Sequence, residues 1–232
     1  VYYFEVAAVN AYGKSEVEKS ETFTVGTVPT APSNVTLTQV KLSDADGTLV
    51  RMKWGDVEGE TGYRVEYREA GTEEWTAFEL KANAQSQSVY DFTPGQTYEF
   101  RVCAENVYGA SAWSTASITP LVAPTVEIAA VDGNAKTATL ALSAPTGATQ
   151  MRLEVSTEPF ATEAAIPAKN LFYSVTLKAD ATTATIKNLE PGATYYYRVY
   201  AINANGTSDW CDTAAFALLD APTDVALSQV KL

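Results

Sequence analysis

Residues 98–106 read Tyr98-Glu99-Phe100-Arg101-Val102-Cys103-Ala104-Glu105-Asn106. Apolar residues fill every second position, so Tyr98, Phe100, Val102 and Ala104 share one face of an extended chain. An alternation with a period of two residues is typical of a β-strand that buries one side. The stretch therefore predicts a strand at the surface of an apolar core, and the rest of the sequence repeats it.

Two further copies of this stretch occur, at residues 2–10 (Tyr-Tyr-Phe-Glu-Val-Ala-Ala-Val-Asn) and at 195–203 (Tyr-Tyr-Tyr-Arg-Val-Tyr-Ala-Ile-Asn). Each copy is followed by Gly-x-Ser, at residues 13–15, 109–111 and 206–208. A second phrase, Ala-Pro followed by a β-prone run, begins at Ala31, Ala123 and Ala221. The spacing of these copies is about the length of one small domain rather than of a solenoid repeat.

Other short alternating runs lie between these landmarks. In the first full period Val50, Met52 and Trp54 share a face. Tyr63, Val65 and Tyr67 share another. The aligned residues of the second period are Ala138, Leu140, Leu142, Met151, Leu153 and Val155. Turn-rich segments separate the runs and no window has a helical period, so the sequence predicts antiparallel β-sandwiches.

Several motifs carry a resemblance to a known family. They are Trp54, the run from Tyr63 to Trp75, Phe92-Thr93-Pro94-Gly95-Gln96-Thr97-Tyr98, Leu189-Glu190-Pro191-Gly192-Ala193-Thr194-Tyr195, and the loops Asn106 to Ser111 and Asn203 to Ser208. As a set they resemble the fibronectin type III family. The resemblance implies an all-β fold of tandem immunoglobulin-like antiparallel β-sandwiches. It also implies that Tyr98 and Tyr195 form tyrosine corners, in which the ring packs inward and the hydroxyl reaches nearby backbone.

The period and the resemblance together predict the domain organisation. We expect the last two strands of one repeat in residues 1–27, complete repeats in 28–120 and 121–218, and the first strand of a further repeat in 219–232. The second complete repeat is divergent, because Leu142 replaces the Trp54 of the first. A two-stranded hairpin is marginally stable in water, so we do not expect residues 1–27 to fold as an independent domain.

The composition argues against most kinds of chemistry. The chain has no histidine, which removes Ser-His-Asp and Cys-His catalysis and the commonest metal ligand. Its formal net charge of −12 would repel nucleic acid. The two cysteines, Cys103 and Cys211, are expected to be thiols, with a disulfide as the alternative. We therefore predict no enzyme activity and no catalytic, cofactor or metal site, no cofactor, no nucleic-acid partner and no membrane insertion in this segment.

The predicted function is a spacer and protein-interaction module of a larger secreted or cell-surface protein, with an extracellular or cell-surface location. Its expected partners are neighbouring repeats and flanking domains. Two alternatives stay open: an adhesive segment that binds a protein or carbohydrate through loops at Tyr108 and Asn205, and an accessory module of an extracellular, polysaccharide-active enzyme. Fold alone cannot separate these functions.

Overall fold

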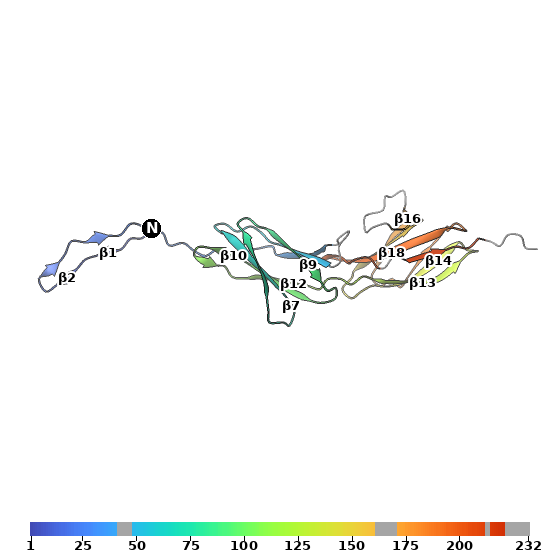
Figure 1. The fold of residues 1–232 in the computed structure, drawn as a ribbon, viewed down its shortest axis with the longest axis horizontal. Coiled ribbons are helices and arrows are strands. Elements are labelled where there is room, and N and C mark those ends of the chain that lie inside the picture. Colours follow the sequence, from blue (N-terminus) through green and yellow to red (C-terminus); the bar gives the residue numbers. More distant parts are fainter. Residues whose placement is uncertain (41–47, 161–170, 212–213, 221–232) are drawn as a thin grey trace, which may run out of the picture.

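The structure is a computed structural model and describes residues 1–40, 48–160, 171–211 and 214–220. The described residues contain strands and turns and no helix. They form a hairpin followed by two β-sandwiches, arranged end to end (Figure 1). The all-β sandwich fold expected from the sequence is confirmed. The strand expected in 219–232 lies almost entirely outside the described residues.

The described residues of the first sandwich form eight strands. They are β5 (Thr36–Val40), β6 (Thr48–Lys53), β7 (Gly62–Glu69), β8 (Thr76–Lys81), β9 (Ser86–Phe92), β10 (Tyr98–Asn106), β11 (Gly109–Ala110) and β12 (Ser114–Ile118). One sheet has the order β5-β6-β9 and the other has the order β8-β7-β10, continued by β11 and β12. The apolar faces of these sheets meet in a core that contains Val50, Met52, Trp54, Tyr63 and Phe100.

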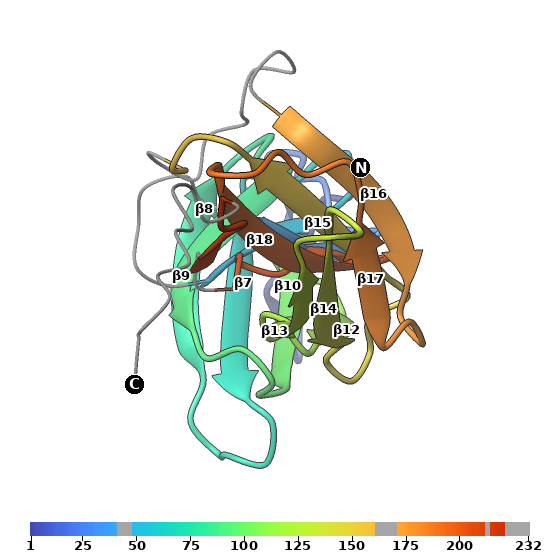
Figure 2. The ribbon, with the colours of Figure 1, turned by 90° about the vertical axis from the view of Figure 1, so that its right-hand side faces the viewer.

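The second sandwich repeats this plan. Its strands are β13 (Thr125–Asp132), β14 (Thr137–Ser143), β15 (Gln150–Ser156), β16 (Leu171–Lys178), β17 (Thr183–Ile186), β18 (Thr194–Asn203), β19 (Gly206–Thr207) and β20 (Ala214–Ala217). One sheet has the order β13-β14-β17, and the other contains β16-β15-β18 with β19 and β20 beside β18. Figure 2 views the molecule along its long axis, with the second sandwich in front, so that the layer of β15, β16 and β18 and the layer of β13 and β14 can be seen. All six core residues aligned from the sequence are buried: Ala138, Leu140, Leu142, Met151, Leu153 and Val155.

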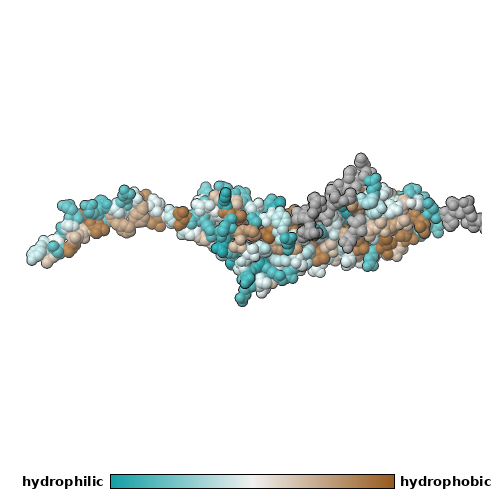
Figure 3. All heavy atoms as spheres, in the orientation of Figure 1, coloured by the Kyte–Doolittle hydropathy of each residue, from teal (hydrophilic) through white to brown (hydrophobic). Residues whose placement is uncertain are grey.

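The N-terminal hairpin contains β1 (Glu5–Val6), β2 (Val9–Asn10), β3 (Gly13–Lys14) and β4 (Glu18–Lys19). β1 pairs with β4 and β2 pairs with β3, so the segment is one two-stranded ribbon. Its aromatic side chains contact each other, with ring centroids 5.2 Å apart for Phe4 and Phe23. No second sheet covers the ribbon among the described residues, and apolar residues line one side of it in Figure 3.

The two sandwiches share one sheet. β19 of the second sandwich pairs in parallel with β5 of the first, at Gly206 and Gln39. This bridge extends the sheet order to β16-β15-β18-β19-β5-β6-β9, across the boundary between the sandwiches. The backbone therefore connects the sandwiches through hydrogen bonding as well as through the covalent linker.

Candidate functional site

The motif tyrosines form the corners that the family resemblance implies. The backbone N–H of Thr93 donates to the hydroxyl of Tyr98 at 3.1 Å, and that of Glu190 donates to Tyr195 at 2.8 Å. Both rings are buried. Each hydroxyl thus anchors the backbone of the turn that precedes its strand, while the ring contributes to the core.

The Pro-Gly pairs of these motifs hold the chain that leaves each sandwich. Pro94 and Pro191 are exposed in the turn. The N–H of Gly95 donates to the carbonyl of Pro120 at 2.8 Å, and the N–H of Gly192 donates to the carbonyl of Leu218 at 2.7 Å. Both glycines have a positive φ, 85° and 77°, that other residues adopt at a cost.

The remaining motif residues are core residues. Trp54 is buried, and its ring lies 5.6 Å from that of Tyr63, centroid to centroid. Leu189 is also buried, in the core of the second sandwich. Of the family-motif residues, Trp54, Leu189 and the two corner tyrosines stabilise the sandwiches, and the Pro-Gly pairs direct the linkers.

A turn with the sequence Asn-x-x-Gly-x-Ser recurs at residues 10–15, 106–111 and 203–208; we call these the Asn-Gly-Ser turns. In each turn the Asn side chain accepts a hydrogen bond from the backbone N–H two residues later, at 2.8, 2.9 and 2.8 Å. In each turn the Ser hydroxyl accepts the backbone N–H of the residue seven positions earlier, at 3.0, 3.0 and 2.9 Å. The sequence motif therefore specifies the same turn geometry three times.

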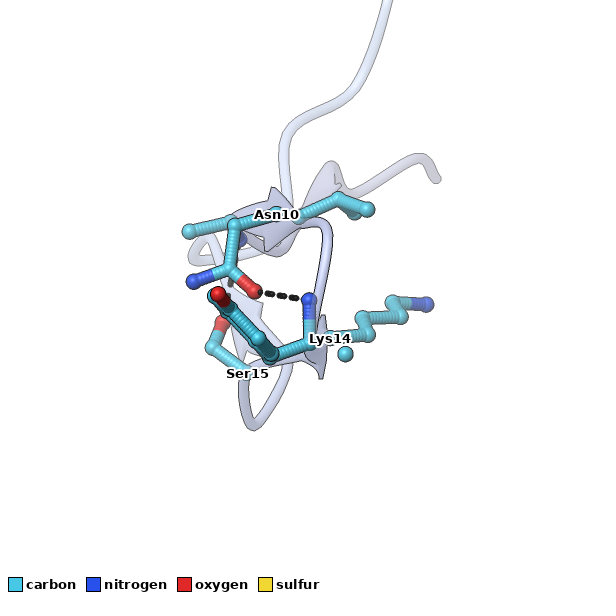
Figure 4. A pocket seen from close by; sticks show the side chains of 7 residues that line it. Asn10, Lys14 and Ser15 are labelled. Atoms are coloured by element: carbon cyan, nitrogen blue, oxygen red, sulfur yellow. Dashed lines mark hydrogen bonds between the residues drawn. The ribbon is translucent and has the colours of Figure 1, made fainter.

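The first Asn-Gly-Ser turn is open to solvent. Figure 4 shows Asn10, Lys14 and Ser15, with the Asn10 side chain hydrogen-bonded to the backbone of the turn. Tyr12 at its tip is 98% exposed. A Cβ atom placed on Gly13 would have no neighbour within 4 Å.

The second Asn-Gly-Ser turn contacts the linker that precedes its own sandwich. The Asn106 side chain donates to the carbonyl of Thr27 at 3.0 Å. The ring of Tyr108 covers Gly26 so closely that a Cβ on Gly26 would lie 1.9 Å from it. Tyr108, a loop contact in the adhesive alternative, therefore lies against Gly26 of the same chain while 55% of it stays exposed.

The third Asn-Gly-Ser turn contacts the preceding sandwich itself. The backbone N–H of Gln39 in β5 donates to the carbonyl of Asn205 at 2.7 Å. A Cβ on Gly206 would lie 2.1 Å from the carbonyl oxygen of Gln39. Asn205, the other predicted loop contact, is thus part of a joint between the two sandwiches.

The side chain of Gln39 completes this joint. It is 4% exposed, and its amide oxygen accepts the N–H of Leu121 at 2.7 Å while its amide nitrogen donates to the carbonyl of Leu121 at 3.2 Å. At the edge of the joint, the Thr48 hydroxyl donates to the Asp209 carboxylate at 3.3 Å. Sequence reasoning did not single out Gln39 or Leu121. The signal was present, because Gln39 belongs to the phrase Gln-Val-Lys-Leu that recurs at residues 229–232.

Arginine and tryptophan side chains stack on the outer faces of both sandwiches. In the first, the guanidinium of Arg101 lies 4.0 Å from the ring centre of Trp75 and 4.4 Å from that of Trp113. In the second, Arg198 lies 3.8 Å from Trp210. The carboxylates of Glu66 and Glu154 pair with these arginines, so each stack is neutralised internally.

Burial raises the pKa of four described side chains: Tyr63 and Cys103 in the first sandwich, and Tyr197 and Tyr200 in the second. Burial, followed by the hydrogen bond that the hydroxyl donates to Asp56 at 2.8 Å, raises the pKa of Tyr63 to about 12. Burial, followed by the charge of Glu105, raises the pKa of the Cys103 thiol to about 11. These shifts favour the neutral forms, so they activate none of these groups as a nucleophile.

The described residues contain no group of three or more side chains that could hold a metal ion. They also contain no helix that is long and apolar enough to cross a membrane. Cys103 and Cys211, for their part, form no disulfide in the described part of the chain. What the geometry supplies is a pair of stable cores and a hydrogen-bonded joint.

Comparison with known proteins assigns the class. The family model for the fibronectin type III domain matches residues 30–120 and 122–216, which is most of the chain. The chain belongs to the fibronectin type III family, and the resemblance seen in the sequence is confirmed.

Two curated relatives share this region. M-protein of striated muscle from Gallus gallus is 28% identical over 237 residues, which cover 88% of this chain and 15% of that protein. Cardiac-type myosin-binding protein C from Mus musculus is 36% identical over 115 residues, which cover 47% of this chain and 9% of that protein. The chain thus spans a small fraction of the length of these relatives.

These relatives correct one prediction. The expected extracellular or cell-surface location is wrong, because the matched proteins are named for striated muscle and for binding myosin. The sequence argument failed because type III sandwiches serve proteins in several compartments, and nothing in a packed β-core depends on the compartment.

Two solved structures resemble the chain at low identity. The FN1–FN3 domains of chicken CNTN1 have a TM-score of 0.45 and 18% identity, over 94% of this chain and 75% of that one. A two-domain fibronectin type III segment from chicken tenascin has a TM-score of 0.37 and 16% identity, over 81% of this chain and 99% of that one.

Proposed function

We propose that this chain is a non-enzymatic spacer within a larger protein, in which type III domains in series hold flanking segments at a set distance and orientation. The domain units of this proposal are residues 28–120 and 121–218. Binding of other proteins would then depend on what the spacer presents to them rather than on a reactive site of its own.

The observation that carries this proposal is the short, anchored linker. The N–H of Gly95 donates a hydrogen bond to the carbonyl of Pro120, and the hydroxyls of Thr97 and Thr119 lie 2.7 Å apart. The N–H of Leu121 donates to the side-chain oxygen of Gln39. β13 of the second sandwich begins at Thr125, so only residues 122–124 lie between the anchored chain and the next strand. A linker this short that includes a proline, Pro124, is stiff.

The test is whether the two sandwiches tumble as one body. Residual dipolar couplings of the full chain in a weakly aligning medium should fit one alignment tensor for both sandwiches. The control combines a flexible Gly-Ser insertion between Val122 and Ala123 with Gly206→Ala, so that both the linker and the β19–β5 contact are disrupted, and it should give two tensors of different magnitude. Two different tensors for the unmodified chain would contradict the spacer function.

A further inference from the structure

We propose that the Asn-Gly-Ser turns at residues 203–208 and 10–15 are surfaces with which a type III domain binds the domain before it, and that their partner is the edge of that domain's first strand; turn 106–111 contacts the linker instead. This inference rests on the proposed spacer function, since it names the contact that fixes the orientation. The contact between turn 203–208 and β5 supplies the geometry.

The partner surface is a sheet edge. Within its own sandwich β5 pairs only with β6 among the described strands, and its other side is the edge that β19 of the second sandwich contacts at Gln39. An unpaired edge accepts a further segment through main-chain hydrogen bonds, whose strength does not depend on side-chain identity. Asn205 supplies such a bond when its carbonyl accepts the Gln39 N–H at 2.7 Å.

The glycine of the turn permits the close approach. Gly206 has φ +129° and lies directly against the Gln39 backbone, where a Cβ would be 2.1 Å from the carbonyl oxygen. Gly13 of the first turn has a similar φ, +148°, and no neighbour within 4 Å of a Cβ. The two glycines therefore share a backbone conformation. They differ in that Gly206 contacts an edge strand, whereas Gly13 contacts none in the described part of the chain.

The glutamine of the edge strand makes the contact specific. Its side chain is 4% exposed and satisfies both backbone groups of Leu121 in the linker. A buried amide that loses such partners pays a desolvation penalty, so another side chain at Gln39 would leave Leu121 with unpaired polar groups. A type III domain with glutamine at this position is thus the fitting partner for the turn.

The same reasoning assigns a role to the open turn at residues 10–15. It has the bonding pattern of turn 203–208, keeps its glycine, and is uncovered in the described part of the chain. We infer that it, too, fits the first-strand edge of a type III domain, placed before it.

The experiment uses the full chain with Gly206→Ala, Gln39→Ala and the matched control Gly13→Ala. Gly206→Ala and Gln39→Ala should split the single alignment tensor into two. They should also raise the hydrogen-exchange rate of the Gln39 amide or the Leu121 amide, respectively, by at least about tenfold. Gly13→Ala should leave both readouts unchanged, although it places the same strain on its turn.

The measurements distinguish a variant that has unfolded, a failure of this inference and a failure of the proposed spacer function. Unchanged exchange of amides within β10 and β18 would show that both sandwiches remain folded, and Gln39→Ala tests the joint from the side opposite to the turn. If both joint variants keep one tensor and slow exchange at Gln39 and Leu121, the linker alone fixes the orientation and the inference is wrong. Two tensors in the unmodified chain would instead contradict the spacer function.

Discussion

The hairpin segment Tyr2–Asn10 and strand β10 have closely similar sequences and opposite environments. Tyr2, Phe4 and Val6 are 60%, 64% and 68% exposed. Their counterparts Tyr98, Phe100 and Val102 are 8%, 1% and 0% exposed. The apolar alternation is the same, so what differs is the presence of a facing sheet.

The turns that follow these two segments show no such difference. Ser15 and Ser111 accept backbone N–H groups at the same distance, 3.0 Å, and Asn10 and Asn106 close their turns alike. Bonds between residues that are near in sequence thus form with or without a core. The comparison separates local geometry, which a short segment carries with it, from burial, which depends on distant strands.

Hydrogen exchange provides the sharpest contrast between the two segments. Amides of β1 and β2 should exchange at least about three orders of magnitude faster than those of β10, because local opening of a bare ribbon costs little whereas exchange in a core strand requires global unfolding. Exchange followed by NMR on monomeric protein measures this directly. Slow exchange at Val6 in the monomer would show that the hairpin is stable alone.

A pair of Phe→Ala substitutions, one in β10 and one in the hairpin, tests how burial affects the free energy of unfolding. Phe100→Ala should lower the free energy of unfolding of the first sandwich by about 3–5 kcal/mol, because a buried ring is lost and a cavity remains. Phe4→Ala should change it by less than about 0.5 kcal/mol, since an exposed side chain loses few contacts. Urea unfolding followed by tryptophan fluorescence in a Trp210→Phe background reports on this sandwich, because the remaining tryptophans, Trp54, Trp75 and Trp113, all belong to it. Equal changes in the free energy of unfolding for Phe100→Ala and Phe4→Ala would contradict the difference in burial between β10 and the hairpin.

Alkaline titration tests burial through the pKa of Tyr63. The pKa lies near 10 for an unfolded tyrosine and at about 12 in the fold, because burial and the bond to Asp56 disfavour the phenolate. The unfolded state releases this proton first, so the stability contributed by neutral Tyr63 is complete below pH 10 and is lost as the pH rises to 12. Urea midpoints between pH 9 and 12 should fall less steeply for Tyr63→Phe than for the parent chain. Tyr2→Phe, in the hairpin, is the control and should keep the parent slope.

The smallest effect is expected at the tyrosine corner. Tyr98→Phe should cost about 0.5–1.5 kcal/mol, because the N–H of Thr93 loses its acceptor. Tyr2→Phe should cost nothing measurable, since Tyr2 lies on an exposed ribbon. Thermal unfolding of both variants beside Tyr195→Phe, which removes the equivalent bond in the second sandwich, makes the measurement. No change for either corner variant would argue that water replaces the hydroxyl at no cost.

Much of the architecture could be predicted from the residues. The alternation at Val50 and Met52 predicted buried strand faces, and the offset alignment found Leu140 and Leu153 in the second core. The corner at Tyr98 followed from its motif. These predictions succeeded because side-chain alternation in a strand and turn chemistry depend on residues within a few positions of one another.

The candidate site was harder to predict. Tyr108 and Asn205 were named as loop contacts only in the adhesive alternative, which stays a prediction, and the contacts that each makes within this chain were not foreseen. Gln39 carries no family motif, and its importance comes from Leu121, 82 positions away in the sequence. Such a contact depends on how two folded bodies meet, which local patterns do not encode.

The order of residues along the chain is enough to predict the strands, the three Asn-Gly-Ser turns and membership of the fibronectin type III family. The three-dimensional fold is needed to see that Phe100 is buried while Phe4 is exposed, and that the turn at Gly206 lies on Gln39 while the turn at Gly13 is open. The physical reason is the range of the interactions. Backbone geometry and turn hydrogen bonds form between near neighbours, whereas burial and joints require surfaces that the chain brings together only on folding.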